Sequence, residues 1–429
     1  MKIGLIAMSG IRACDTKLLE LGLTLPGFVE RSKQIASLPS LGLLTLAGMT
    51  PCEHTVSYHE APDAASAAAL PMDFDLVAIS SLSAQVKEAY ALAESYHAYG
   101  VPDEPARHGA TAVLGEGELA WPLILADAAC GALKPVYDMR GQEFNLSEAP
   151  MPAFELLDMN RYNRITVQTS RGCPWRCSFC ASSILLTRKY KQKPATKVLA
   201  EIDRIISLWP RLFIEFADDN SFVNRAYWHD LLPEIAKRRI RWFAETDLSI
   251  HQDDALLEKM RAAVCAQVLI GFESPTPAGL SGVELRKDFK RNRFAEYKDA
   301  IRRIQSHGIT VNACFVVGLD GHDMQIFDSI EDFVADALPW DVQITVPTPF
   351  PGTPLYRQMQ REERLIEDNA WEKCTLFDIN IYPQRLTVDE LRNGFYGLSR
   401  DLYGDEFTKM RRDAFQRLWR ESWKQRRAA

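Results

Sequence analysis

The first third of the chain alternates short apolar runs with segments of helical period. Strands are predicted at Lys2–Ala7, His54–Tyr58, Asp75–Ser80 and Ala110–Leu114. Helices are predicted between them at Leu41–Met49 and Val86–Tyr99. Strands that alternate with helices favour a parallel, doubly wound sheet covered on both faces. Residues 1–135 are therefore expected to form an N-terminal, Rossmann-like α/β domain.

The alternation stops after Pro135 and resumes at Arg164. The interval 136–163 carries Pro150 and Pro152 with little periodicity, so a linker is expected there. Six further strands are predicted at Ile165–Thr169, Leu212–Phe216, Trp242–Thr246, Gln267–Phe272, Val311–Val317 and Asp341–Val346. The helices between them are predicted at Lys197–Leu208, Trp228–Arg238, Asp253–Ala263, Phe294–His307 and Asp323–Ala335. Right-handed crossovers would curl residues 164–355 into a partial (β/α)₆ barrel, with a mostly helical extension over 356–429.

Composition narrows the class of protein. With 429 residues, 47% of them hydrophobic and 25% charged, the chain is expected to hold two or three globular domains. No run approaches the roughly 20 apolar residues of a membrane span, and the first residues lack the features of a signal peptide. The expected compartment is the cytoplasm. A net charge of −7 argues against nonspecific binding of nucleic acid, which needs a cationic surface.

Positive charge gathers only near the C-terminus. The basic residues there are Lys409, Arg411, Arg412, Arg417, Arg420, Lys424, Arg426 and Arg427. They are interleaved with Met410, Phe415, Leu418, Trp419 and Trp423. Because the apolar residues have helical spacing, a docked amphipathic helix with a solvated face is favoured over an RNA or membrane patch.

Three cysteines stand close together directly after the strand predicted at Ile165–Thr169. Cys173, Cys177 and Cys180 have the spacing C-x₃-C-x₂-C, on a loop at the end of a barrel strand where chemistry is usually carried. Thiolates are soft ligands for iron, and one short loop can wrap three of them around a [4Fe-4S] cubane, whose usual complement is four. One iron then stays open to a chelating ligand, such as the amino-acid part of S-adenosylmethionine (SAM).

Two simpler interpretations of these cysteines fit less well. A structural zinc site wants four ligands, usually in two short pairs, and the sequence has no second CxxC or nearby Cys/His pair. Three cysteines within eight residues are also too clustered for chance core filling. The other cysteines are Cys14, Cys52, Cys130, Cys265, Cys314 and Cys374. These are expected to be small buried hydrophobes rather than a disulfide framework.

Polar residues also follow the later barrel strands. Asp218, Asp219 and Asn220 end the second strand, where their oxygens could bind an ammonium group. The alternative is an Asx turn that caps the next helix. Glu245 and Glu273 could bind the ribose hydroxyls or the amine of SAM, or pair with Arg or Lys inside the barrel.

Two turns at the ends of the last barrel strands are candidates for shaping the site. Gly318 would let the backbone approach an adenine closely. The turn Pro351–Leu355 is rigid and could simply close the edge of the barrel.

The cysteine spacing, with Phe179 just before the last cysteine, resembles the cluster loop of radical SAM enzymes. The resemblance implies that Phe179 belongs to the cofactor site and that the Asp218–Asn220 position contacts the SAM amino group. Weaker motifs extend the resemblance to the branch of hopanoid methylases and related class B radical SAM methyltransferases, which have a cobalamin-binding-type N-terminal domain. These motifs are Leu38–Leu43, Gly115–Glu118, Phe216–Phe222, Gly271–Ser274, Phe315–Gly321 and Pro351–Leu355.

The resemblance implies cobalamin above the barrel mouth, often without a protein ligand to cobalt, and a methyl group delivered to a substrate radical. A reductant such as flavodoxin or ferredoxin is implied as well. This chain departs from the pattern after Val101, where relatives continue with an apolar strand and a Gly-Gly-x-His-type loop. The sheet is therefore expected to have lost one strand, with a wall of the cobalamin pocket, and cobalamin binding stays open. His108 is expected at the surface or a helix end rather than on cobalt.

Methylation of an unactivated carbon in a small metabolite, with cobalamin, is the leading functional prediction. A cyclisation, oxidation or rearrangement without cobalamin is the first alternative. RNA modification is a weaker one, because the chain lacks a second three-cysteine motif and an evident C-terminal RNA-binding domain. Substrate identity and oligomeric state do not follow from the sequence, since no substrate motif is portable between subfamilies.

Overall fold

The computed structural model describes residues 1–8, 13–20, 38–67, 69–95, 110–181, 189–209 and 213–428. These residues form two compact units. The first holds the described residues of 1–11, 34–168 and 191–212, and the second holds those of 12–33, 169–190 and 213–429. The domain boundaries expected from the sequence remain a prediction.

A parallel sheet forms the centre of the first unit. Its strands are β1 (Lys2–Met8), β2 (Thr55–Ala61) and β3 (Leu76–Ser80), in the order β2-β1-β3. The helices of this unit include α2 (Leu41–Met49), α4 (Val86–Ser95), α5 (Gly117–Ala129) and α6 (Ala195–Leu208). Strand β1 lies between its two neighbours and is almost wholly buried, which explains its continuous apolar sequence.

The remaining strands of the first unit form a second, smaller sheet. Strand β4 (Ala112–Leu114) pairs in parallel with β5 (Val136–Asp138), and neither pairs with β3. Strand β5 lies in the interval where a linker was expected. The segment after Val101, including His108, lies outside the described residues. Among the described residues, the strands of the first unit therefore form two parallel sheets, and the expected loss of a strand after Val101 remains a prediction.

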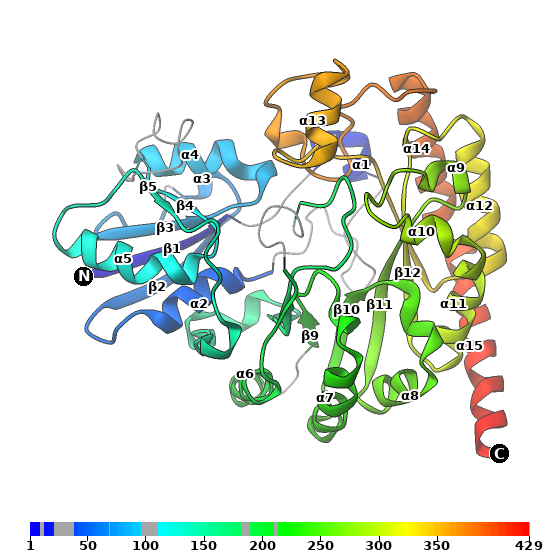
Figure 1. Ribbon diagram of the computed structural model, residues 1–429, viewed down its shortest axis with the longest axis horizontal. Helices are drawn as coiled ribbons and strands as arrows, with labels where there is room; N and C mark the ends of the chain where they lie inside the picture. The colour runs from blue at the N-terminus through cyan, green and yellow to red at the C-terminus, as the bar shows by residue number, and fades with distance from the viewer. Residues whose placement is uncertain are drawn as a thin grey trace. The chain divides into compact units, whose positions relative to one another are not determined.

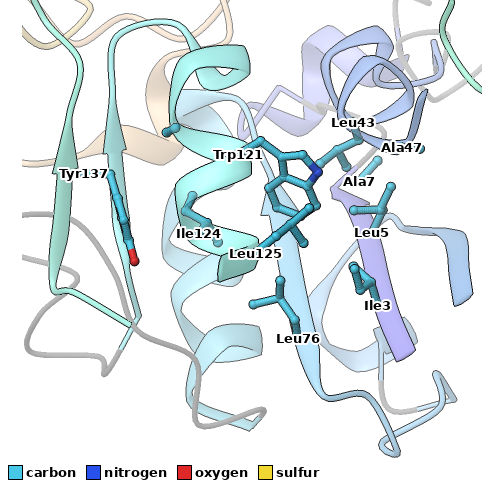
Figure 2. Close-up of a cluster of buried hydrophobic side chains, with 11 residues drawn as sticks. Ile3, Leu5, Ala7, Leu43, Ala47, Leu76, Trp121, Ile124, Leu125 and Tyr137 are labelled. Atoms are coloured by element: carbon cyan, nitrogen blue, oxygen red, sulfur yellow. The ribbon is translucent and has the colours of Figure 1, made fainter. Parts of the chain in front are cut away.

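One apolar core supports both pieces (Figure 2). Trp121 of α5 points toward Leu43 and Ala47 of α2, while Tyr137 of β5 packs in the same cluster. The indole nitrogen of Trp121 donates a hydrogen bond of 2.9 Å to the hydroxyl of Thr50. Burial of an aromatic side chain with its polar atom paired is strongly stabilising, so Trp121 is a central residue of this core.

A larger parallel sheet runs in sequence order through the barrel region. Its order is β13-β12-β11-β10-β9-β6. The strands are β6 (Ile165–Val167), β9 (Phe213–Phe216), β10 (Arg241–Thr246), β11 (Cys265–Glu273), β12 (Thr310–Val316) and β13 (Asp341–Thr345). The helices α7 (Arg225–Arg238), α8 (Asp254–Ala262), α11 (Tyr297–Ser306) and α12 (Gln325–Ala337) follow successive strands from β9 to β12. The predicted α/β fold with six barrel strands is confirmed.

Aromatic residues join this sheet to the helices that cover its outer face (Figure 1). Trp242 of β10 stacks on Trp228 of α7, with ring centroids 6.3 Å apart. Phe315 of β12 meets Phe333 of α12 edge to face at 5.5 Å. These side chains alternate along their strands with residues of the inner face, because successive residues of a strand point to opposite sides.

The C-terminal extension is mostly helical, as predicted. It contains α13 (Pro354–Arg361), α14 (Val388–Tyr403) and α15 (Asp405–Ala428). Phe415 of α15 is buried and meets Trp340 at 5.0 Å, and Arg426 forms an ion pair of 3.0 Å with Glu258. The interpretation of the basic segment as a docked amphipathic helix is therefore confirmed. Among the described helices, none combines the length and the apolar character needed to cross a membrane.

Shorter elements complete the described chain. They are α1 (Thr16–Glu20), α3 (Ala64–Ala67), β7 (Ser170–Arg171), β8 (Lys191–Gln192), α9 (Pro277–Leu280) and α10 (Phe289–Asn292). Helices α9 and α10 interrupt the long segment between β11 and α11, where no element was predicted.

Substitution Trp121→Ala should destabilise the first unit by about 3–5 kcal/mol, because it opens a cavity in the core shared by both sheets. Leu123→Ala is the matched control, since Leu123 lies on the same helix with 46% of its surface exposed and should cost less than about 0.5 kcal/mol. Urea unfolding of both variants measures the difference. Equal losses in the two variants would contradict this view of the core.

Candidate active site

The three clustered cysteines lie on one loop of the second unit, after β6 and β7. All three side chains are partly buried and are free thiols. Burial is the main cause that raises the pKa of Cys173 to about 11 and that of Cys177 to about 12, and Cys180 contributes to both shifts. The loop therefore brings the three sulfurs close enough to influence one another. The expectation that the scattered cysteines are buried is wrong for three of them, because Cys14, Cys52 and Cys130 are exposed.

This donor set fits an iron–sulfur cubane better than a single ion. Among the described residues, no three His, Cys, Asp or Glu side chains converge where one metal ion could sit. In a cubane each thiolate binds a different iron, so its ligands stand farther apart than those of a mononuclear site. Binding would displace the three thiol protons, since only thiolates ligate metal.

A buried glutamate, Glu284, holds the middle of the cysteine loop. Its carboxylate accepts hydrogen bonds from the backbone N–H of Arg176 at 3.1 Å, of Arg286 at 3.1 Å and of Lys287 at 2.7 Å. Burial opposes ionisation, but these backbone donors outweigh it and lower the pKa of Glu284. Cys177 also forms an isolated antiparallel bridge with Glu284. The loop around Glu284 thus aligns the backbone of the central cysteine.

Trp175 fixes the start of the same loop. Its ring stacks on Phe289 with centroids 3.8 Å apart, and its indole N–H donates to the carboxylate of Asp247 at 2.9 Å. The amide of Asn220 donates to the same carboxylate at 2.8 Å and lies 3.9 Å from the sulfur of Cys173. Although burial opposes it, donors from Ser249, Trp175 and Asn220 lower the pKa of Asp247. The negatively charged carboxylate of Asp247 is therefore linked to the first cysteine through Asn220.

The acidic residues after β9 accept hydrogen bonds from the cysteine loop and from the residues just before it. Asp218 is buried and accepts hydrogen bonds from the N–H and hydroxyl of Thr169 at 2.7 and 2.6 Å. Burial raises its pKa to about 6 despite these donors. Asp219 accepts from the N–H of Gly172 at 2.9 Å, directly before the first cysteine. The expected helix cap is supplied by Asn224 instead, whose side chain accepts from the N–H of Tyr227.

The proposed contact of Asp218, Asp219 and Asn220 with SAM remains a prediction. The structure places all three beside the cysteine loop, as expected. Their hydrogen bonds hold that loop and the residues just before it, so they serve its geometry. Phe179 lies in the turn between Cys177 and Cys180, closed by a hydrogen bond of 3.2 Å from the Cys180 N–H to the Cys177 carbonyl.

Glu273 ends β11 in an ion pair with Lys290. Its φ of 65° is unusual for a residue with a side chain, and such backbone strain concentrates at functional sites. Lys290 also donates to the carbonyl of Gly271 at 2.7 Å. Burial opposes it, yet the negative charges of Glu273 and Cys177 raise the pKa of Lys290. Of the two roles considered for Glu273, the structure shows the ion pair with a lysine inside the barrel, next to the cysteine loop.

Glu245 and Gly318 lie at the ends of other strands of this sheet. Glu245 of β10 is exposed and close enough to Cys314 of β12 to raise its pKa. Gly318 has a φ of 93°, and a Cβ there would meet Leu391 at 2.8 Å. Both the backbone and the packing therefore require glycine, independently of any adenine. The roles predicted for these two residues in cofactor binding remain predictions.

A buried histidine, His322, joins the ends of β11 and β12. Its Nδ1 accepts from the N–H of Leu319 at 3.3 Å, so the proton lies on Nε2, which donates to the hydroxyl of Ser274 at 2.8 Å. A Cβ at Gly279 would meet Nε2 at 2.1 Å. His322 therefore links Ser274 of the Gly271–Ser274 motif to Leu319 of the Phe315–Gly321 motif, in a space too small for a side chain at Gly279.

The comparison with known families decides the class of the second unit. Residues 167–334 match the family described as the radical SAM superfamily. The chain carries a radical SAM domain. The prediction of a radical SAM enzyme is thereby confirmed, and with it a [4Fe-4S] cluster and SAM as the cofactors of this family.

Named relatives share most of the length of this radical SAM protein. Bacteriochlorophyllide d C-12(1)-methyltransferase of Chlorobaculum tepidum is 26% identical over 358 residues, covering 78% of this chain and 76% of the relative. Hopanoid C-2 methylase of Rhodopseudomonas palustris is 28% identical over 360 residues, covering 79% and 67%. The predicted resemblance to the branch of hopanoid methylases is confirmed by this similarity.

A solved structure shows the same fold. The radical SAM methyltransferase TsrM from Kitasatospora setae, determined with cobalamin and a [4Fe-4S] cluster, has a TM-score of 0.60 and 15% identity. The match covers 84% of this chain and 75% of TsrM.

Several supporting residues of this radical SAM domain were missed by sequence reasoning. Glu284, Lys290 and His322 lie outside the recognised motifs, while Trp175 lies inside the cysteine motif but acts through Asp247, 72 residues away. The turn Pro351–Leu355 does more than close an edge, because the Leu355 N–H donates to the carbonyl of Ser178 at 3.0 Å. The cysteine loop is thus held from several sides.

Substitution Glu284→Ala should weaken cluster retention by about 10- to 100-fold, because it removes the acceptor for three backbone donors beside Cys177. Loss of iron to a chelator after anaerobic reconstitution measures the effect. Glu284→Gln, which keeps one acceptor oxygen, should lie between wild type and Ala. The exposed Glu421→Ala is the control. Wild-type retention in Glu284→Ala would show that the loop holds its own shape.

The neutral form of His322 should make stability fall with acid. Burial lowers the pKa of His322 from 6.5 to about 4, so the unfolded chain takes up this proton at a higher pH than the folded chain. The contribution is fully present above pH 6.5 and is lost as the pH falls toward 4, by up to about 3 kcal/mol. His322→Gln should flatten the pH dependence of urea unfolding between about pH 7 and pH 5. An unchanged slope would contradict the assignment.

Proposed function

We propose that this radical SAM enzyme methylates an unactivated carbon of a small metabolite, with cobalamin as methyl carrier. The observation that carries the proposal is the loop of Cys173, Cys177 and Cys180, held at the ends of the barrel strands within the matched domain. When bound, the cluster supplies the electron that cleaves SAM to methionine and a 5′-deoxyadenosyl radical, and cobalamin supplies a methyl group. A reductant of the flavodoxin or ferredoxin type would feed the electron.

The chain's own residues would prepare this chemistry by shaping and insulating the loop. Glu284 and Asp219 accept hydrogen bonds from backbone N–H groups of the loop, and Asp247 accepts from the side chains of Trp175 and Asn220. Lys290 places a buried positive charge beside Cys177, which favours the thiolate form. The Glu273–Lys290 pair offers the oxygen and ammonium groups that an amino acid cofactor would need at the open iron.

Methyl transfer is favoured by the relatives and by polar residues of the first unit. Tyr58 of β2 and Ser80 at the end of β3 both hydrogen bond to Ser40, the N-cap of α2: the Ser40 N–H donates to the Tyr58 hydroxyl at 2.8 Å, and the Ser40 hydroxyl to that of Ser80 at 3.2 Å. Glu60 accepts from the hydroxyl of Tyr162. Such groups fit the amide side chains of a corrin, and ligands bind such sheets at this edge.

A reaction without cobalamin is the second candidate, and one observation in the Gly115–Glu118 motif supports it. The carboxylate of Glu116 accepts hydrogen bonds from the Phe144 N–H at 2.8 Å and from Lys191 at 2.5 Å, so it is engaged within the protein. RNA modification is not favoured, because Phe415 and Arg426 dock the basic helix onto the protein.

Anaerobic reconstitution followed by product analysis tests the proposal. With dithionite and SAM, wild type should form 5′-deoxyadenosine, and hydroxocobalamin should add S-adenosylhomocysteine. The variant Cys173→Ala, Cys177→Ala, Cys180→Ala should form neither product, because its loop can no longer hold the cluster. Cys52→Ala, Cys130→Ala is the control, since both residues are exposed and lie in the first unit.

The two candidate functions give different results in this experiment. Production of 5′-deoxyadenosine that does not change with hydroxocobalamin, together with no retention of hydroxocobalamin on dialysis, would exclude the methyl-transfer form and leave radical initiation. Full activity of the triple cysteine variant would contradict both.

A further inference from the structure

The inner face of the six-stranded sheet is polar although it is buried. On β12, Val311, Ala313 and Phe315 alternate with Asn312 and Cys314, and Phe315 packs on the outer helices. Asn312 and Cys314 therefore face the opposite, inner side. The register pairs Asn312 with Asp341 and Cys314 with Gln343 on β13. Paired residues of neighbouring strands share a face, so all four line the inner side.

Several polar atoms on this face have no hydrogen-bond partner in the described part of the chain. Asn312 is 1% exposed, and neither its oxygen nor its nitrogen is paired. The same holds for Oδ2 of Asp341, Oε1 of Gln343 and Oε1 of Gln267 on β11. Native proteins pair nearly all buried polar atoms, because an unpaired one costs free energy. Apolar residues would have made a more stable sheet, so these side chains are kept for something else.

The inner face also lies close to the cysteine loop. Gly271 of β11 pairs with Cys314 of the inner face, and its carbonyl accepts a hydrogen bond of 2.7 Å from Lys290, which also pairs with Glu273. Lys290 follows closely after Lys287, whose N–H is bound to the same Glu284 that bridges Cys177. Burial raises the pKa of Cys314, and Glu273, Glu245 and Asp341 raise it further, whereas Lys290 lowers it. Carboxylates therefore gather around the middle of this face, which favours a molecule that brings hydrogen-bond donors.

We infer that the inner face binds the substrate, and that the substrate is a polar molecule carrying hydrogen-bond donors rather than a hydrocarbon. Donors of the substrate, such as an amide or an ammonium group, meet Asp341, Gln343 and the carbonyl oxygen of Asn312, and an acceptor meets the Asn312 amide. The inference rests on the proposed function, since it assumes that a radical formed at the cysteine loop acts on a molecule held beside it. It separates this chain from an enzyme that acts on an apolar lipid.

Ordered water is the competing occupant. A buried water typically makes about three hydrogen bonds to otherwise unpaired polar groups. Water alone would satisfy the same atoms without selecting any substrate, so the test must distinguish selection from simple hydration.

The test measures the turnover of SAM by the reconstituted full chain with two extracts of the same cells. One extract contains the water-soluble small molecules and the other the hexane-soluble lipids, and the products are 5′-deoxyadenosine and S-adenosylhomocysteine. Wild type should turn over SAM severalfold faster with the aqueous extract than without it, and no faster with the lipid extract. Asn312→Leu and Gln343→Leu should lose this stimulation, expressed as the ratio of turnover with and without extract.

Ser399→Ala is the matched control, because its hydroxyl is also buried and unpaired but lies on α14. It should keep the stimulation ratio. Melting temperatures and circular dichroism establish that each variant folds. If Gln343→Leu does not fold, Gln343→Met takes its place, because methionine is apolar and of the same length as glutamine. Because the apolar substitutions remove unpaired polar atoms, their melting temperatures should equal or exceed that of wild type.

The outcomes separate this inference from the proposed function. Absence of 5′-deoxyadenosine from wild type overturns both. Formation of 5′-deoxyadenosine with stimulation by the lipid extract alone, or by neither extract, overturns only the inference. Stimulation that persists in Asn312→Leu and Gln343→Leu also overturns it, and means that the inner face holds water only.

Discussion

The structure of the site depends on how the cysteine loop satisfies its backbone. Three thiols must point to one place, and the described part of their loop has neither helix nor long strand to pair its N–H and carbonyl groups. Acidic side chains take that role: Asp218 binds the end of the first strand, Asp219 the residue before Cys173, and Glu284 the residue before Cys177. Each carboxylate offers several acceptor positions, so a few residues organise the whole loop.

This arrangement explains why the polar residues after β9 are ambiguous from sequence. An Asp at the end of a parallel strand is equally suited to bind a ligand or to brace the neighbouring loop. Asp218 shows the bracing role, because its carboxylate is buried and accepts hydrogen bonds from Thr169 and Ser170. Asp219 and Asn220 lie beside the first cysteine, so their position suits a contact with a cofactor. The contact predicted for them depends on the hydrogen-bonding capacity that their bonds to the loop leave unused.

Sequence reasoning succeeded where the signal is local. Strand β10 was expected at Trp242–Thr246 and spans Arg241–Thr246, because the short run of apolar residues in a buried strand is visible in a short window. The cysteine loop was found from spacing alone. The partners of that loop were not found, because Glu284 lies 108 residues from Arg176 and its role depends on which backbone atoms the fold brings near it. Helices α9 and α10 were missed since each is a single short turn.

In the first unit, apolar side chains connect the two sheets that the described strands form. Trp121 and Leu125 of α5 pack with residues of β1, α2 and β3, and Tyr137 of β5 joins them. Dispersion and apolar burial are not directional, so one core can serve strands that do not pair with each other. A large ligand at the edge of the sheet is more demanding, since it needs a continuous wall with donors and acceptors in place. Stability and ligand binding can therefore diverge in this unit.

The second unit shows the opposite relation between packing and function. Its outer face carries aromatic and aliphatic residues that pack on helices, which gives the barrel its stability. Its inner face carries Asn312, Asp341 and Gln343, which lower stability unless something pairs with them. In the inference drawn above, a bound substrate supplies the missing hydrogen-bond partners, so the free energy that the inner face withholds from folding becomes available for binding. The cysteine loop differs from the inner face, because side chains of the protein itself pair its backbone N–H groups at Gly172 and Arg176.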